Sequence, residues 1–322
     1  MNASARILGH DTGANPAMRI GIDLGGTKTE AMLMAPDGSD KMRLRVPTPA
    51  KDYPANLDML ASLVAQLDEK AGHPCPVGIG IPGAMSPQTR LIKNANSTWL
   101  IGEPFLADLE NRLGPRVRIA NDADCFTLSE ATDGAGAAFN TVFGVILGTG
   151  VGGGLVVNGS LLSGPNAIAG EWGHTPLAWM TDQEHPGPDC YCGKKGCVEA
   201  WCSGPALAAD HARVAGEVRS PEEIVARAHS GNVAARSTLD RHADRLARAL
   251  STVINIIDPK AIVLGGGLSD LDHLYPQVMS RLPDYVFSDT VVTPVLKNQH
   301  GASSGIRGAA WLWPVDASVG VD

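Results

Sequence analysis

One arrangement of residues occurs twice in the 322-residue chain, and it constrains the fold more than any other feature. Residues 20–24, Ile-Gly-Ile-Asp-Leu, run into a glycine turn at 25–29 and then into a second apolar stretch. Residues 143–147, Phe-Gly-Val-Ile-Leu, run into glycines at 148–154, a second apolar stretch and an Asn-Gly turn. Each copy predicts two antiparallel strands joined by a glycine turn.

The segments that follow the two copies match in order as well. Apolar residues recur at helical spacing between 57 and 67, and a buried strand follows at 77–81. A longer helix is indicated between 239 and 257, where Asp-Pro stops it, and a strand follows at 261–264. We therefore expect an α/β protein in which two domains of duplicated plan face each other across a cleft.

The same features suggest where the domains begin and end. We expect an N-terminal α/β domain at 18–122 and a C-terminal α/β domain at 123–300. Residues 301–316 are expected to form a C-terminal helix that returns to the N-terminal domain. Residues 1–17 are polar and glycine-rich, and we expect a disordered extension there.

Charge and hydropathy exclude several classes of protein. Lys and Arg total 26 against 34 Asp and Glu, the formal net charge is −8, and the basic residues form no run. Nucleic acid is therefore not an expected partner. The chain has neither a stretch of roughly 20 apolar residues to cross a bilayer nor a secretion signal near its start. We expect no membrane partner and a cytoplasmic location.

The two glycine turns are similar to two well-known phosphate-binding loops, the Walker loop and the dinucleotide-binding loop. In each case the sequence argues against that assignment. The turn at 25–29 has Thr27 where a Walker loop needs the glycine before its lysine. Residues 148–153 satisfy the dinucleotide pattern G-x-G-x-x-G, which would suggest an NAD-dependent oxidoreductase. A short strand and an Asn-Gly turn follow, however, in place of the helix that a dinucleotide site needs.

Four of the six cysteines lie within thirteen positions, which suggests a metal site in a reducing compartment. Cys190, Cys192 and Cys197 form C-x-C-x₄-C, a glycine-containing knuckle that can direct three thiolates to one point. His174 is a candidate fourth ligand. With four protein ligands, Zn²⁺ would be structural. The alternative is a set of ordinary buried thiols and a hydrogen-bonded core histidine.

Three motifs carry a resemblance to a known class. The segments 23–28, 147–150 and 264–267 resemble the phosphate-one, phosphate-two and adenosine motifs of sugar kinases with the actin-like ATPase (ribonuclease H-like) fold. Glu171-Trp172-Gly173-His174 and the segment 190–199 narrow the resemblance to the ROK family of repressors, open reading frames and kinases. The segment 94–100, Asn-Ala-Asn-Ser-Thr-Trp-Leu, looks most like bacterial fructokinases of the mannofructokinase type.

The resemblance implies an ATP site, a zinc ligand and a homodimer. It makes His174 the fourth ligand of a structural Zn²⁺. Apart from the resemblance, Asp23 begins the first glycine hairpin and is a candidate to hold Mg²⁺ through water, because magnesium keeps most of its waters and takes one or two carboxylates near phosphates; the alternative is a buried capping role. The residues that would bind the nucleotide with Mg²⁺ are Asp23, Gly25, Gly26, Thr27, Gly148, Thr149, Gly150, Gly265, Gly266 and Gly267.

Sugars are bound by directed carboxylates and amides, and the chain offers a set of them. Asp122 follows an apolar strand, and the family match favours it as catalytic base over the alternative, a plain helix N-cap. The expected substrate-binding residues are Gly83, Asn96, Asn121, Asp122, Glu171, His174 and Glu199.

The expected activity is ATP-dependent phosphorylation of a hexose, with D-fructose converted to fructose 6-phosphate by a fructokinase. The alternative within the family is an N-acetylglucosamine kinase or a glucokinase. A sugar-responsive transcriptional repressor is the rival from another class. We disfavour it because the seventeen residues before Met18 are too few for a helix-turn-helix domain.

Overall fold

The computed structural model describes residues 18–314, which form two five-stranded sheets of the same plan. In each sheet an antiparallel hairpin comes first along the chain, and parallel strands extend the sheet on one side. The first sheet has the order β3 (Asp40–Pro47), β2 (Lys28–Met34), β1 (Arg19–Leu24), β4 (Val77–Ile81) and β7 (Val117–Asn121). The second has the order β10 (Ser160–Leu161), β9 (Val151–Val157), β8 (Thr141–Leu147), β11 (Ala261–Gly265) and β12 (Val295–Lys297).

This duplication confirms the fold class expected from the glycine modules. The predicted extension at 1–17 lies outside the described residues. Within the described part, no helix is long and apolar enough to span a bilayer.

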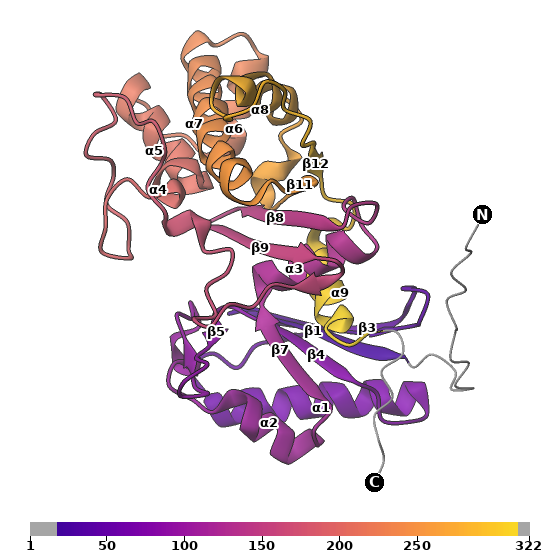
Figure 1. Cartoon of the computed structure of the whole chain (residues 1–322). Coiled ribbons are helices and arrows are strands. Elements are labelled where there is room, and N and C mark those ends of the chain that lie inside the picture. The colour runs from indigo at the N-terminus through magenta and orange to yellow at the C-terminus, as the bar shows by residue number, and fades with distance from the viewer. Residues whose placement is uncertain (1–17, 315–322) are drawn as a thin grey trace, which may run out of the picture.

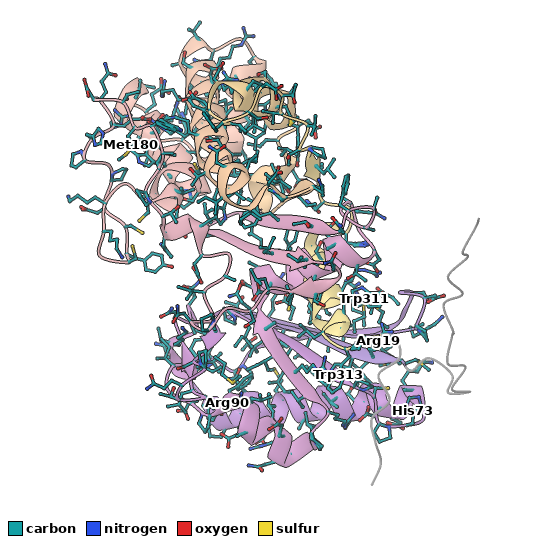
Figure 2. All side chains as sticks on the ribbon, in the orientation of Figure 1. Arg19, His73, Arg90, Met180, Trp311 and Trp313 are labelled. Atoms are coloured by element: carbon teal, nitrogen blue, oxygen red, sulfur yellow. The ribbon has the colours of Figure 1, made fainter. Side chains whose placement is uncertain are left out.

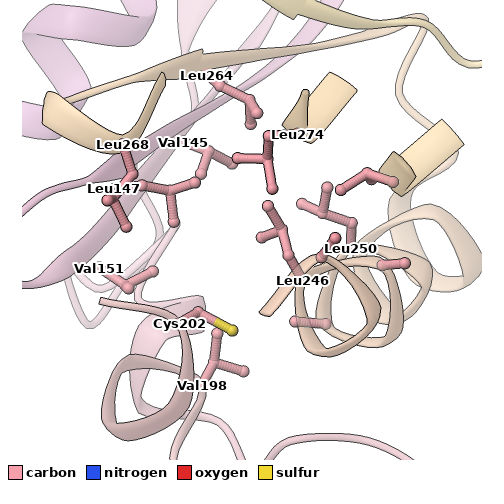
Figure 3. Packing of buried hydrophobic residues seen from close by; sticks show 14 of the residues in the cluster. Val145, Leu147, Val151, Val198, Cys202, Leu246, Leu250, Leu264, Leu268 and Leu274 are labelled. Carbon is pink, nitrogen blue, oxygen red and sulfur yellow. The ribbon is translucent and has the colours of Figure 1, made fainter. Parts of the chain in front are cut away.

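Helices cover the outer face of each sheet (Figure 1). On the first sheet these are α1 (Tyr53–Ala71) and α2 (Phe105–Leu113). The second sheet packs against α7 (Val233–Ile257), whose Leu246 and Leu250 meet Val145 and Leu264 in one buried cluster (Figure 3). Four more helices extend this half of the molecule: α4 (Val198–Cys202), α5 (Gly204–Ala215), α6 (Pro221–His229) and α8 (Leu274–Arg281).

Two helices lie between the sheets and join them (Figure 1). Helix α3 (Asp122–Thr132) packs on β8 and β9, and α9 (Ser304–Trp311) packs on β1, β4 and α3. The approach of α9 is so close that a Cβ at Gly78 would lie 1.7 Å from the Ala309 carbonyl oxygen. Only glycine fits there. The last segment of the described chain therefore contacts the first sheet.

Helix α9 is shorter than the expected helix at 301–316. A 3₁₀ turn at Gly301–Ser303 precedes it, and it ends at Trp311, three residues before Pro314. Proline disfavours the helical conformation of the residue before it, which accounts for this early end. Residues 315 and 316 lie outside the described part. The domain boundaries drawn from the sequence remain a prediction.

Aromatic side chains hold the end of the chain against the first sheet (Figure 2). The buried Arg19 guanidinium lies 4.5 Å from the centre of the Trp311 ring. The Trp313 indole donates a hydrogen bond to the Val77 carbonyl at 2.9 Å, and Arg118 stacks on its ring at 3.9 Å. These contacts fix α9 relative to β1 and β4. They therefore also fix it relative to the β1–β2 hairpin, which carries the first glycine turn.

Candidate active site

A cavity of about 310 Å³ lies between the two sheets, and it gathers residues from both halves of the sequence. Ten of the residues expected at the site line it: Gly83, Asn96, Asn121, Asp122, Gly148, Thr149, Gly150, Glu171, His174 and Glu199. Asn94, Tyr191, Gly152 and Gly153 line it too and were not expected there, although each lies next to a motif already singled out.

The start of helix α3 brings Asp122 into this cavity. The helix N-cap is Asn121, whose side-chain oxygen accepts a hydrogen bond from the Ala123 N–H at 2.8 Å. The plain N-cap alternative for Asp122 is therefore wrong by one residue: Asp122 is the first residue of the helix. Its Oδ1 shares the same N–H at 2.9 Å. The Asn121 amide also donates to the Gly83 carbonyl at 3.1 Å, which ties the helix start to the turn after β4.

Negative charge is concentrated around Asp122. Protein surrounds its carboxylate, although the cleft leaves it in contact with solvent, and this burial raises its pKa, as does the charge of Glu171. Burial, with smaller contributions from the charges of Asp122 and Glu30, raises the pKa of Asp23 to about 6. Two neighbouring carboxylates that disfavour each other's ionised form would both gain from a bound cation.

Glu199, on the first turn of α4, connects the cysteine segment to the second glycine turn. Its Oε2 accepts a hydrogen bond from the Val151 N–H at 2.9 Å. A Cβ at Gly150 would lie 2.6 Å from the same oxygen, so a side chain at this position would displace the Glu199 carboxylate. At the other end of this turn, the Gly204 N–H donates to the Gly148 carbonyl at 2.8 Å. The glycine turn at 148–150 is thus fixed at both ends.

The other residues expected at the nucleotide lie outside the lining of this cavity. They are Asp23, Gly25, Gly26 and Thr27 of the first hairpin and Gly265, Gly266 and Gly267 after β11. Thr48 donates its hydroxyl hydrogen to the Gly25 carbonyl at 2.8 Å and so holds the first turn. Gly266 has φ +78°, and a Cβ there would lie 2.4 Å from the Leu147 carbonyl oxygen. Packing alone therefore requires this glycine, whatever it binds.

The structure brings the predicted metal ligands together. The donor atoms of His174, Cys190, Cys192 and Cys197 all lie within 4.8 Å of one another. The Cys192 and Cys197 sulfurs are 3.6 Å apart, and the Cys190 sulfur is 3.6 Å from His174 Nδ1. Tetrahedral Zn–S bonds of about 2.3 Å place two sulfurs roughly 3.8 Å apart, so the donor set fits zinc.

Tyr191 connects this cluster to the cavity and was not predicted. Its hydroxyl lies 2.8 Å from His174 Nε2, and the two rings meet edge to face with centres 5.0 Å apart. This contact leaves Nδ1 of His174 facing the thiols, as a ligand histidine needs. A tyrosine between two cysteines carries no sequence signal for such a role, because only the turn of the knuckle brings it to His174.

A buried ionic cluster holds the segment before the knuckle against α7. Glu184 accepts hydrogen bonds from Arg245 Nε at 2.8 Å and from Arg248 Nη1 at 2.9 Å. Arg245 also pairs with Asp210 at 3.0 Å and lies 4.3 Å from the centre of the Trp201 ring. Burial by itself raises the pKa of Glu184, but the two arginines lower it to about 2.

Glu184→Gln should therefore destabilise the protein by about 3 kcal/mol at pH 7, since two buried arginines lose the carboxylate that they share and keep only their pairs with Asp210 and Asp244. The native pKa is below that of an unfolded Glu, about 4.3, so this contribution is complete above that pH and is lost as the pH falls towards 2. Urea unfolding at pH 7 and at pH 4 measures the difference, which should shrink at pH 4.

Glu217→Gln is the matched control, because the carboxylate of Glu217 pairs with Arg219 and Arg227 but is 43% exposed. It should cost less than about 1 kcal/mol. If both variants lost the same free energy of unfolding, the buried ion pairs would stabilise the protein no more than the exposed ones.

Two mixed sheets of duplicated plan, joined by helices around a polar cleft, define the actin-like ATPase class of fold. The chain belongs to the ROK family, whose profile matches residues 19–315. It is 39% identical over 301 residues to an N-acetyl-D-glucosamine kinase from Haemophilus influenzae, covering 92% of this chain and 99% of that protein. An N-acetyl-D-glucosamine kinase from Yersinia pseudotuberculosis is 38% identical over 299 residues, covering 92% and 98%.

Solved structures of ROK proteins superimpose on the whole described fold. A ROK hexokinase from Thermus thermophilus matches with a TM-score of 0.81 and 27% identity, covering 91% of this chain and 97% of that one. A ROK glucokinase from Streptomyces griseus, solved with glucose and AMPPNP, matches with a TM-score of 0.72 and 28% identity, covering 92% and 98%.

Proposed function

We propose that this protein is a sugar kinase that transfers the γ-phosphoryl group of ATP to the terminal hydroxyl of N-acetyl-D-glucosamine. The relatives named N-acetyl-D-glucosamine kinases, which match over nearly their whole length, support this sugar. The segment 94–100 by itself favours fructose as the substrate. The relatives described above favour the alternative, N-acetylglucosamine, instead.

The observation that carries the proposal is one cavity in which Asp122 and the glycine turn 148–150 both take part. Asp122 is the catalytic base and accepts the proton of the sugar hydroxyl. Its raised pKa brings it nearer to the working pH, where a base is most effective. Asn121 caps the helix and so fixes the direction of the neighbouring carboxylate.

The phosphate donor binds between the two glycine turns. Thr149 offers a hydroxyl and an N–H to the transferred phosphoryl group, and its neighbours lack side chains that would hinder approach. Asp23 is the residue that would hold Mg²⁺. When bound, this ion neutralises the charge that develops on the phosphate oxygens. Gly265, Gly266 and Gly267 accept the adenosine part.

The sugar is held by Gly83, Asn96, Asn121, Glu171, His174 and Glu199. His174, Cys190, Cys192 and Cys197 would hold Zn²⁺, which would make the loops that carry Glu171 and Glu199 rigid, a structural rather than a chemical role. In the free protein Tyr191 orients the His174 ring through Nε2, and a bound sugar would take over this hydrogen bond from the tyrosine.

A coupled assay of ADP release over a panel of hexoses tests the proposal. N-acetylglucosamine should give the highest kcat/KM, at least about tenfold above fructose and glucose, because a site that hydrogen-bonds a substituent discriminates against sugars that lack it. A clear preference for fructose would support the fructokinase that the segment 94–100 indicates, and it would leave the proposed role of Asp122 unchanged. ADP release with none of the hexoses would contradict the kinase itself.

A further inference from the structure

A second cavity, of about 220 Å³, adjoins the proposed sugar site. The two cavities share Asn121, Gly153 and Glu171 in their walls. Most of the second wall is apolar, and it includes Met85, Leu161, Leu162, Ile168 and Ala169. This second cavity, called the side cavity below, is therefore mostly apolar, whereas the cavity that it adjoins is polar.

The segment 161–171 closes this side cavity. It leaves β10 on the second sheet and runs towards β5 (Ala84–Met85) beside the first (Figure 1). Lys93, on β6 (Ile92–Lys93), donates a hydrogen bond to the Asn166 carbonyl at 2.7 Å and holds the segment in place. Residues of both sheets therefore form the walls of this cavity, and a hydrogen-bonded segment closes it.

One polar group in this wall lacks a partner. The Oδ1 atom of Asp124 is inaccessible to solvent and makes no hydrogen bond within residues 18–314. It lies against β9, where a Cβ at Gly154 would be 3.0 Å from it. Because β9 covers Oδ1 and Asp124 lines the cavity, the other carboxyl oxygen, Oδ2, is the atom that can meet a ligand there. A carboxyl group in a mostly apolar wall is costly unless it finds a hydrogen-bond partner, and a ligand with a polar group at this point would supply one.

The protonation of Asp124 favours a ligand that accepts a hydrogen bond. Burial, with smaller contributions from the charges of Asp122 and Glu171, raises the pKa of Asp124 to about 7. Near neutral pH a substantial fraction of this carboxyl therefore carries its proton and can donate it in a hydrogen bond.

An acylamino group combines the required properties, because it has a carbonyl oxygen that accepts and an apolar end. The cavity has room for about seven water-sized groups at roughly 30 Å³ each, more than the four heavy atoms of an acetamido group need. A plain hydroxyl, as in glucose, would leave the apolar walls without contact and Asp124 without a partner.

We propose that this side cavity is the subsite for the N-acyl group of the sugar and that Asp124 donates a hydrogen bond to its carbonyl oxygen. This inference rests on the proposed function, since it assumes an acylated amino sugar in the polar pocket. Asp124 is thereby a specificity-determining residue, and Asp122, two positions earlier, remains the base.

The test compares kcat/KM for N-acetylglucosamine and glucose in the wild type, Asp124→Ala and Asp124→Asn. Asp124→Ala should lower the ratio of the two values about tenfold, which corresponds to one lost hydrogen bond. Asp124→Asn should keep the ratio within about threefold of the wild type, because the amide still donates. An unchanged ratio in Asp124→Ala would overturn the proposal.

N-propionylglucosamine tests the cavity without altering the fold. The wild type should phosphorylate it within about threefold of N-acetylglucosamine, given the spare volume. Ala169→Leu, which fills part of the wall, should lower activity on the propionyl sugar about tenfold more than on the acetyl sugar. Rejection of the propionyl sugar by the wild type, by about a hundredfold, would contradict the subsite.

The outcomes separate this inference from the proposed function. Wild-type protein that phosphorylates another hexose but not N-acetylglucosamine would overturn the proposed sugar, and the subsite with it. Wild-type protein that prefers N-acetylglucosamine, with the same preference in Asp124→Ala, would overturn the subsite alone.

Discussion

Asp122→Asn is expected to keep sugar binding while kcat falls by about a hundredfold or more, because the amide has the shape of the carboxylate but cannot accept the hydroxyl proton. The side chain can still share the Ala123 N–H through its oxygen, and Asn121 still caps α3, so the helix should start where it does now. Steady-state kinetics and sugar titration measure the two effects separately.

Asp58→Asn is a suitable control, because it makes the same chemical change on α1, where the side chain is 70% exposed. Its kcat should match the wild type. If Asp122→Asn also stayed within a few-fold of the wild type, Asp122 would be a structural residue at the helix start and the proposed mechanism would lose its base.

Cys192→Ala should remove Zn²⁺ and weaken sugar binding about tenfold or more, with a smaller effect on nucleotide binding. The wild type should hold one zinc per chain. Loss of one thiolate opens a saturated tetrahedron, and the knuckle then no longer fixes Glu199 or the Tyr191–His174 contact at the cavity. Of the glycines proposed for the nucleotide, those at 25–26 and 265–267 are distant in sequence from the knuckle, and only the turn 148–150 is in contact with Glu199, so the effect on nucleotide binding should be the smaller one. Elemental analysis and separate titrations of sugar and nucleotide provide the measurements.

Cys202→Ala is the control for this change, since Cys202 is buried in the same region but lies outside the four converging donors. It should keep the zinc and the sugar affinity. A fully active wild-type preparation without metal would refute the structural zinc. Equal loss of sugar and nucleotide binding in Cys192→Ala would instead indicate general unfolding.

Local patterns in the sequence were enough for the architecture. Each glycine hairpin was visible because a tight turn between apolar runs has few alternatives, and the matching order of helix and strand implied duplication. The cysteine knuckle was visible for a related reason: its three thiols are close in sequence, so no long-range contact is needed to bring them together. The length of the final helix was overestimated, since apolar residues continue past the point where Pro314 limits it.

The site residues that sequence reasoning missed all depend on distant contacts. Tyr191 reaches His174 only through the turn of the knuckle. Glu184 reads as an ordinary surface glutamate until α7 places two arginines against it. Asp124 looks like a second acidic residue of a helix start, and nothing in its neighbours along the chain predicts a buried, unpartnered oxygen.

The sequence by itself determined the two duplicated sheets, the glycine turns, the candidate base and the metal ligands, because local sterics and ligand chemistry act over a few residues. Only the tertiary structure decided which of these residues share one cavity, that Asn121 rather than Asp122 caps α3, and that a second, mostly apolar cavity adjoins the first. Those properties depend on packing between segments as distant as Gly78 and Ala309. Such contacts depend on close packing between segments that only the folded chain brings together. They therefore produce no periodic pattern in the sequence from which they could be predicted.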